Sequence, residues 1–174
     1  MSDIGLNIVL IGFMGVGKTT IGRRTAGKLG MDFYDTDEYI KKCEKMPAGE
    51  LLKKKGEKYF QGAQRFAVTN IVDNRNCLIS TGGNTVCDEY NMELLCKNSL
   101  VVWLRAKAET VYENTKNSRN KRPEISGASL EDIEALLNQK AKFYENCDIV
   151  IDVDELEVDD VADIIASEYN KRKK

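Results

Sequence analysis

The residues that most clearly predict chemistry form a glycine-rich loop near the start of the chain. Residues 12–19, with the sequence GFMGVGKT, fit the phosphate-binding pattern G-x-x-x-x-G-K-[ST] at every fixed position. Glycines in such a loop let successive backbone N–H groups point at an anion, and the N-terminus of the following helix adds its dipole. We therefore expect Lys18 to reach the β- and γ-phosphates of a nucleoside triphosphate and the Thr19 hydroxyl to ligate Mg²⁺.

Two carboxylates follow the next predicted strand. Asp35 and Asp37 come directly after a short aromatic run at 33–34. In an open parallel sheet the carboxyl ends of the strands are where ligands bind. Asp35 can hold Mg²⁺ through water opposite Thr19, and Asp37 can accept a hydrogen bond or the proton from an attacking hydroxyl. The alternative is that Asp37 only caps the helix that follows it.

Two further segments have compositions that suit phosphoryl transfer. A glycine pair at 82–83 follows an apolar run at 77–80 and would let the backbone approach a ligand closely. Residues 116–127 are polar and basic, which predicts a mobile lid that brings Lys121 or Arg122 onto the transferring phosphate. A plain turn and a solvated loop are the alternative interpretations of these two segments.

The elements that must position these residues alternate along the chain. Strands are expected at 6–11, 33–34, 77–80, 100–104 and 148–151, and helices at about 20–29, 38–73, 106–115, 130–145 and 158–169. Pro47 and Gly56 are expected to interrupt the long helical stretch, which is a natural place for an acceptor-binding region. The alternation predicts a doubly wound α/β fold with a mostly parallel sheet and right-handed crossovers.

Composition limits the class of protein further. The chain has 174 residues and no linker-like segment, so we expect one domain over 1–174. The net charge of −2 gives no general affinity for nucleic acid or anionic membranes, and no apolar run approaches the ~20 residues that span a bilayer. Five scattered cysteines, no histidine and no basic leader predict a cytoplasmic protein with reduced thiols, whose general base must be a carboxylate.

Several groups of residues, in order and at near-family spacing, resemble the shikimate kinase family. They are the phosphate loop, Asp35-Thr36-Asp37, Gly56-Glu57-x-x-Phe60, Gly82-Gly83, Arg122-Pro123 and Tyr144. The resemblance covers essentially the whole chain. It implies a three-layer P-loop kinase fold of the nucleoside-monophosphate-kinase type, with a five-stranded parallel sheet, helices on both faces, an acceptor-binding region at about 36–73 and a lid at about 116–127. It also implies transfer of the γ-phosphate of ATP, with Mg²⁺, to the 3-hydroxyl of shikimate.

The resemblance, carried over position by position, implies the site residues. Catalysis is expected from Lys18, Asp37 and Arg122, and metal binding from Thr19 and Asp35. Nucleotide contacts are expected from Gly12, Gly15, Val16, Gly17, Lys18, Thr19, Thr20, Arg119 and Asp154. Acceptor contacts are expected from Asp37, Gln61, Gly82, Gly83, Asn84 and Lys140, and also from Arg65, which the family pattern does not include.

Four positions depart from the family pattern, together on one side of the acceptor. The family has a carboxylate-binding arginine after Phe60 and a glutamate that braces it, where this chain has Gln61 and Gln64. A second carboxylate-binding arginine is replaced by Lys140, and the third glycine of a Gly-Gly-Gly run is replaced by Asn84. Two bidentate arginines have thus become one amide and one ammonium, which is not a conservative exchange.

The arginine missing from position 61 has a counterpart one helical turn later. Gln61 and Arg65 are four residues apart, so we expect them to share one face of a continuous helix. We expect Arg65, with Lys140, to contact an acceptor whose anionic group lies elsewhere than in shikimate. The alternative is that Arg65 faces solvent beside a neutral pocket.

The identity of the acceptor therefore stays open at the level of sequence. Shikimate, a related polyol, a gluconate-like acid and a nucleoside monophosphate are the alternatives, with ATP as donor and a monomeric protein as the expected state. A GTP-dependent switch would need an Asn-Lys-x-Asp run, and the nearest match, at 120–123, lacks the aspartate. A catalytically silent relative is disfavoured because Lys18, Thr19, Asp35 and Asp37 are all intact.

Overall fold

A computed structural model describes residues 5–117 and 123–173 of the chain. Part of the predicted lid lies outside the described residues, and with it Arg119, Lys121 and Arg122. No helix within the described ranges is long and apolar enough to cross a membrane.

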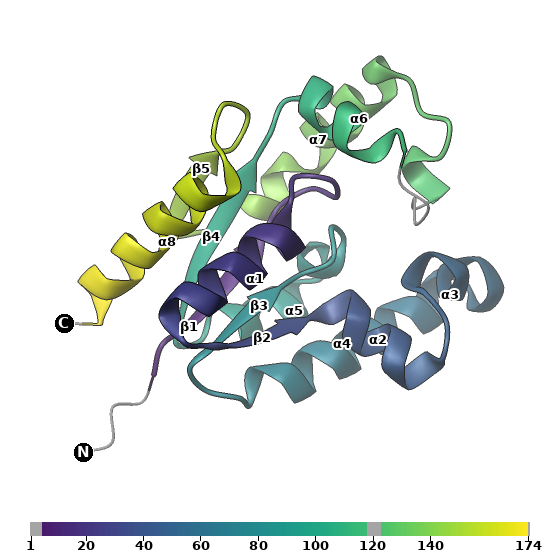
Figure 1. The fold of residues 1–174 in the computed structure, drawn as a ribbon. Coiled ribbons are helices and arrows are strands. Elements are labelled where there is room, and N and C mark those ends of the chain that lie inside the picture. The colour runs from purple at the N-terminus through teal and green to yellow at the C-terminus, as the bar shows by residue number, and fades with distance from the viewer. Residues whose placement is uncertain (1–4, 118–122, 174) are drawn as a thin grey trace.

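A single parallel sheet forms the centre of the molecule (Figure 1). Its strands are β1 (Asn7–Ile11), β2 (Asp32–Asp35), β3 (Cys77–Ser80), β4 (Ser99–Arg105) and β5 (Ile149–Asp152), in the order β2-β3-β1-β4-β5. All four pairings are parallel, and in the register Val9 of β1 lies between Ile79 of β3 and Val101 of β4. The five predicted strands and their parallel arrangement are therefore confirmed.

Helices cover both faces of the sheet, which gives the predicted three layers. Alternate residues of β1 point to opposite faces because the side-chain period of a strand is two. Ile8 and Leu10 pack with buried residues of α1 (Lys18–Leu29) and α8 (Val158–Arg172). Val9 and Ile11 pack with buried residues of α4 (Glu57–Val72) and α5 (Glu89–Cys96).

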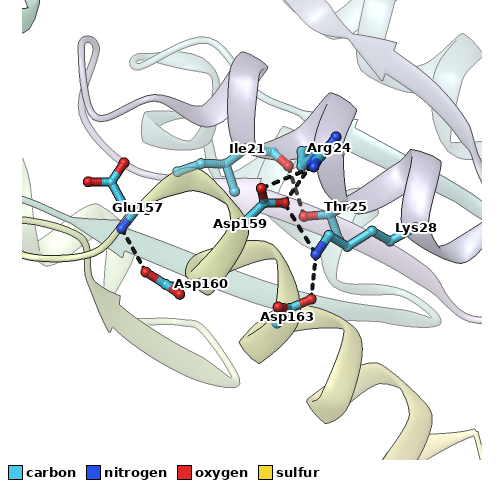
Figure 2. Close-up of polar contacts among 8 residues, drawn as sticks. All are labelled: Ile21, Arg24, Thr25, Lys28, Glu157, Asp159, Asp160 and Asp163. Carbon is cyan, nitrogen blue, oxygen red and sulfur yellow. Dashed lines mark hydrogen bonds and ion pairs between the residues drawn. The ribbon is translucent and has the colours of Figure 1, made fainter.

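Ion pairs join α1 to α8, the two neighbouring helices drawn in dark purple and yellow in Figure 1. Figure 2 shows Arg24 and Lys28 of α1 directed at the carboxylates of Asp159 and Asp163. Arg24 Nε lies 2.6 Å from Asp159 Oδ1, and Lys28 Nζ lies 2.6 Å from Asp163 Oδ1. The C-terminal helix is thus fixed against the helix that starts at the phosphate loop.

The predicted helical stretch after β2 consists of three helices that form a small cluster of their own. They are α2 (Thr36–Glu44), α3 (Ala48–Lys55) and α4. Pro47 and Gly56 separate them as predicted, and Gly56 has a φ of 84°, a conformation that favours glycine. Ile40, Leu51 and Phe60, one from each helix, are fully buried together.

The remaining helices lie between β3 and β5. They are η1 (Thr85–Cys87), α5, α6 (Ala108–Thr115), η2 (Pro123–Ile125) and α7 (Leu130–Tyr144). The short helices η1 and α5 were not predicted from the sequence. Asp88 is the N-cap of α5 and accepts a hydrogen bond from Tyr90 N, so the sequence signal at this position was an aspartate cap.

Candidate active site

The phosphate loop connects β1 to α1 at the carboxyl edge of the sheet. Gly12, Gly15 and Gly17 have φ values of 142°, 81° and 96°, in the range where glycine avoids the strain that a side chain would cause. A Cβ atom on Gly12 would also lie 2.3 Å from the carbonyl oxygen of Leu104. The loop ends at Gly17, the N-cap of α1, so the helix N-terminus points into the loop as the sequence motif requires.

Lys18 lies inside this loop and is only 7% exposed. Its ammonium donates hydrogen bonds to the carbonyl oxygens of Gly12 at 2.7 Å and Phe13 at 2.8 Å. The Val16 side chain is buried in the core, so Val16 can offer a ligand only its backbone, whereas Thr20 is exposed on the first turn of α1. The loop therefore places one buried cation and several backbone N–H groups where a phosphate chain can bind.

Asn114 of α6 supports the phosphate loop from the side and was missed in the sequence. Its Nδ2 donates a hydrogen bond to the carbonyl oxygen of Gly15 at 2.8 Å. On the same helix, Thr115 packs so closely that a Cβ atom on Gly15 would lie 2.5 Å from its methyl group. No local motif marks Asn114, because the contact joins residues 99 positions apart.

Thr19 and Asp35, the two residues predicted to bind a metal ion, contact each other directly. Thr19 Oγ1 donates a hydrogen bond to Asp35 Oδ2 at 2.9 Å. The other carboxylate oxygen of Asp35 accepts from the backbone N–H groups of Asp37 at 2.9 Å and Glu38 at 3.1 Å. Asp35 is thus the N-cap of α2, and the alternative in which Asp37 caps this helix is wrong. Burial, followed by the neighbouring charge of Asp37, raises the pKa of Asp35 above its usual value.

Asp37, on the first turn of α2, lies against the glycine pair that follows β3. We call residues 82–84 the acceptor loop. A Cβ atom on Gly82 would lie 2.5 Å from Asp37 Oδ1, and one on Gly83 would lie 3.1 Å from the backbone nitrogen of Met14. Gly82 N donates a hydrogen bond to the Thr36 hydroxyl at 2.9 Å. The acceptor loop therefore touches both the phosphate loop and the start of α2.

A cavity of about 700 Å³ opens beside the acceptor loop, between α4 and the start of α5. It brings together predicted acceptor residues with several acidic side chains: Glu57, Gln61, Gln64, Arg65, Asn84, Cys87, Asp88, Glu89, Tyr90 and Glu93. The prediction that Gln61 and Arg65 share a face of one continuous helix is confirmed, since both belong to α4 and both line this cavity.

Arg65 is paired within the protein, which neither interpretation of the sequence had foreseen. Its Nε and Nη2 atoms donate hydrogen bonds to Asp88 Oδ2 at 2.6 Å and Oδ1 at 3.0 Å. Hydrogen bonding to Arg65 lowers the pKa of Asp88 below its usual value. The guanidinium also lies 5.0 Å from the centre of the Tyr90 ring. Gln61 is turned toward Glu57, with Nε2 3.3 Å from Oε1.

The opposite side of the acceptor loop is held by α7. Lys140 Nζ donates a hydrogen bond to Asn84 Oδ1. One turn later, the buried Tyr144 hydroxyl donates to the carbonyl oxygen of Gly83 at 2.8 Å. Burial raises the pKa of the Tyr144 phenol, so it remains a hydrogen-bond donor throughout the neutral range.

Gln64, a departure from the family pattern, and Asp154, a predicted nucleotide contact, have surroundings that the sequence did not indicate. Gln64 is 3% exposed, and its Nε2 has no hydrogen-bond partner among the described residues. Asp154 Oδ1 accepts hydrogen bonds from Lys107 N at 2.8 Å and Thr110 Oγ1 at 2.7 Å, so this carboxylate fixes the start of α6. It borders a cavity of about 640 Å³ beside the loop after β5, where the resemblance implies a contact to the nucleotide.

The fold and this geometry together define a class of protein. A phosphate loop with a buried lysine lies on a parallel sheet of order 2-3-1-4-5, next to a threonine–aspartate pair and a second, glycine-containing loop. These are the features of a P-loop kinase.

Comparison with known proteins narrows the class to one family. The shikimate kinase family model matches residues 14–170. Shikimate kinase of Thermodesulfovibrio yellowstonii is 38% identical over 166 residues, which cover 95% of each chain. Shikimate kinase of Caldicellulosiruptor saccharolyticus is 40% identical over 162 residues, which cover 92% of this chain and 94% of that one.

A solved structure of a shikimate kinase is also similar to this chain. Shikimate kinase from Acinetobacter baumannii in complex with shikimate superposes with a TM-score of 0.91 and 25% sequence identity, over 98% of this chain and 96% of that one. The chain belongs to the shikimate kinase family. It is a phosphotransferase that acts on a hydroxyl group.

Proposed function

We propose that this protein transfers the γ-phosphate of ATP to a hydroxyl group of shikimate, with Mg²⁺ as the cofactor. The observation that carries the proposal is the contact of the acceptor loop with two other segments. Gly83 packs against Met14 of the phosphate loop and Gly82 packs against Asp37, so an acceptor bound at this loop lies between the transferring phosphate and a carboxylate. The family relationship supports shikimate as that acceptor.

The pair Thr19 and Asp35 fits a magnesium ion by the chemistry of its donors. A hydroxyl oxygen and one carboxylate, completed by water and substrate phosphates, are the ligands that Mg²⁺ takes in kinases. When bound there, the ion neutralises negative charge on the phosphate oxygens. Asp35 is held in place by two backbone N–H groups as well as by Thr19, so its carboxylate is oriented before any ligand arrives.

Among the described residues, Lys18 and Asp37 are the two that act directly on the reacting groups. The Lys18 ammonium exchanges its hydrogen bonds with the loop carbonyls for the β- and γ-phosphates, where it offsets charge in the transition state. Asp37 orients the acceptor hydroxyl and accepts its proton. The roles of Arg119 and Arg122, which lie outside the described residues, remain those proposed from the sequence: contacts to the nucleotide and to the transferring phosphate.

The remaining assignments follow from the same site. Gln61 and Asn84 line the cavity beside the acceptor loop, and Arg65 lines it through a side chain engaged with Asp88. Lys140 contacts Asn84 from α7 and completes the proposed acceptor residues. The five cysteines are free thiols, which supports a reducing, cytoplasmic location. The phosphate loop and the acceptor loop belong to one fold around one sheet, which supports a single kinase domain, and a monomer stays the expected state.

An acceptor screen tests the proposal. ADP release with ATP and Mg²⁺ is measured with shikimate, quinate, gluconate and nucleoside monophosphates as acceptors. We expect kcat/KM to be highest with shikimate. A higher kcat/KM with any of the other acceptors would contradict the choice of shikimate, and ADP release that no acceptor stimulates would contradict the kinase activity itself.

A further inference from the structure

The two sides of the acceptor pocket differ in charge. On the α4 side, the cavity is lined by four carboxylates and one arginine: Glu57, Asp88, Glu89, Glu93 and Arg65. The one arginine is bound in bidentate fashion by Asp88, and the Gln61 amide is turned to Glu57. A carboxylate on the acceptor would meet like charges on this side, which is unfavourable.

The α7 side carries a cation that is held at the acceptor loop itself. The part-buried Lys140 donates a hydrogen bond to Asn84 Oδ1, and its ammonium lies 5.5 Å from the centre of the Phe13 ring. Phe13 belongs to the phosphate loop and is 1% exposed. Lys140 therefore lies where the acceptor loop and the phosphate loop come together.

Asn84 connects this cation to a second element. While its Oδ1 accepts from Lys140, its Nδ2 donates to Glu124 Oε1 of η2 at 2.8 Å. Both ends of the amide are thus used, so its orientation is fixed from two directions. The backbone of Asn84 has φ −104° and ψ −7°. A residue with a side chain can adopt this conformation without strain, so the position does not require the glycine of the family pattern.

We propose that Asn84 is a positioning residue that holds the Lys140 ammonium at the acceptor loop, so that the anionic group of the acceptor binds on the α7 side of the pocket. This inference rests on the proposed function, and it names a residue that helps to select the acceptor. An ammonium has three N–H donors. One of them binds Asn84, and the others stay available for a carboxylate of the acceptor.

The physical reason for such a residue lies in the lysine side chain. Lysine is a point charge on a flexible four-carbon stem, whereas arginine offers a rigid, planar pair of donors. Binding a carboxylate with lysine requires that the stem be ordered first. Asn84 and the Phe13 ring supply that order before the acceptor arrives, which favours acceptor binding without adding a second cation.

The test compares the steady-state kinetics of four variants: Lys140→Ala, Asn84→Ala, the double variant and Lys142→Ala. Lys142 is an exposed lysine on the same helix and serves as the matched control. We expect Lys140→Ala to raise the KM for shikimate about tenfold to hundredfold, and Asn84→Ala to raise it about threefold to tenfold. The double variant should resemble Lys140→Ala, because Asn84 acts through Lys140.

Two further readouts separate positioning from a merely structural role. The KM for ATP and the melting temperature should stay close to those of the wild type in Lys140→Ala and in Asn84→Ala. With the uncharged carboxamide analogue of shikimate as acceptor, Asn84→Ala should change KM much less than with shikimate itself. A general loosening of the loop would instead raise both acceptor KM values equally.

Three outcomes would overturn the inference while leaving the kinase activity intact. They are additive effects of Asn84→Ala and Lys140→Ala, an unchanged shikimate KM in Asn84→Ala, and equal effects of Asn84→Ala on shikimate and its carboxamide. A wild-type protein without shikimate-dependent turnover would overturn the proposed function and this inference together, so the two failures are distinguishable.

Discussion

Thr19 and Asp35, the first from the start of α1 and the second from the end of β2, are joined by a hydrogen bond of 2.9 Å between Oγ1 and Oδ2. This bond connects the phosphate loop to the segment that carries Asp37. The same aspartate caps α2 through its other oxygen, so one side chain fixes both the proposed metal-binding position and the start of the helix that carries Asp37.

Replacing Asp35 by asparagine should therefore separate metal binding from helix capping. Asparagine caps helices as well as aspartate does, so the melting temperature should change little. The loss of the negative charge should raise the Mg²⁺ concentration for half-maximal activity about 10–100-fold. A titration of activity with Mg²⁺ measures this, and an unchanged Mg²⁺ dependence would contradict the metal role of Asp35.

Asp37→Asn should lower kcat about 10²–10⁴-fold, because the variant cannot accept the proton of the acceptor hydroxyl. Asparagine is nearly the same size, so the close packing against Gly82 is kept and ATP affinity should not change. Asp32→Asn, at the exposed start of β2, is the matched control. If kcat with the correct acceptor stays at the wild-type level, Asp37 has no part in proton transfer.

Tyr144→Phe should affect both stability and acceptor binding. It removes the donor to the Gly83 carbonyl, and leaving this group unsatisfied should lower the free energy of unfolding by about 1–3 kcal/mol. Because the acceptor loop is loosened, KM should rise more for the acceptor than for ATP. Tyr112→Phe, at an exposed position of α6, controls for the loss of a hydroxyl. Wild-type stability in Tyr144→Phe would argue against this anchor.

The ion pairs between α1 and α8 should give stability a defined dependence on pH. Hydrogen bonds from Arg24 and then Lys28 lower the pKa of Asp159 to about 2. A carboxylate with a lowered pKa in the folded state stabilises it above the unfolded pKa, and this effect is lost as the pH falls toward 2. Asp159→Asn should therefore lower the melting temperature slightly at neutral pH.

Because these side chains are about half exposed, the effect should shrink in concentrated salt as well as at acidic pH. Melting curves at several pH values and salt concentrations measure it. Glu155→Gln, a nearby exposed carboxylate, controls for the change in net charge. A difference in melting temperature that does not respond to salt would show that the α1–α8 contact does not depend on charge.

Much of the fold and of the nucleotide half of the site could be predicted from the sequence because the signals are local. The phosphate loop, its lysine and the strand before it are neighbours along the chain, and Pro47 and Gly56 act on their own backbone. The Arg65–Asp88 pair could not be predicted in the same way. Its partners are 23 residues apart, and Asp88 caps a short helix that was not predicted from the sequence.

The acceptor half also depends on contacts between distant elements. Lys140 and Asn84 are 56 residues apart, and neither residue type on its own indicates a pair. The sequence located these positions only through the family resemblance, and it left open whether Arg65 contacts the acceptor with Lys140 or faces solvent. In the structure the Arg65 guanidinium is engaged by Asp88, a contact that neither alternative included.

The central claim is that this chain moves the γ-phosphate of ATP to a hydroxyl of shikimate, and phosphorus NMR of the reaction mixture tests it most directly. With wild-type protein, ATP, Mg²⁺ and shikimate, we predict equal amounts of ADP and one new phosphomonoester, with neither formed when shikimate is omitted. Lys18→Ala should fold and yield neither product, because the cation that offsets charge on the γ-phosphate is gone. ADP with free phosphate and no phosphomonoester, or full activity in Lys18→Ala, would contradict the account.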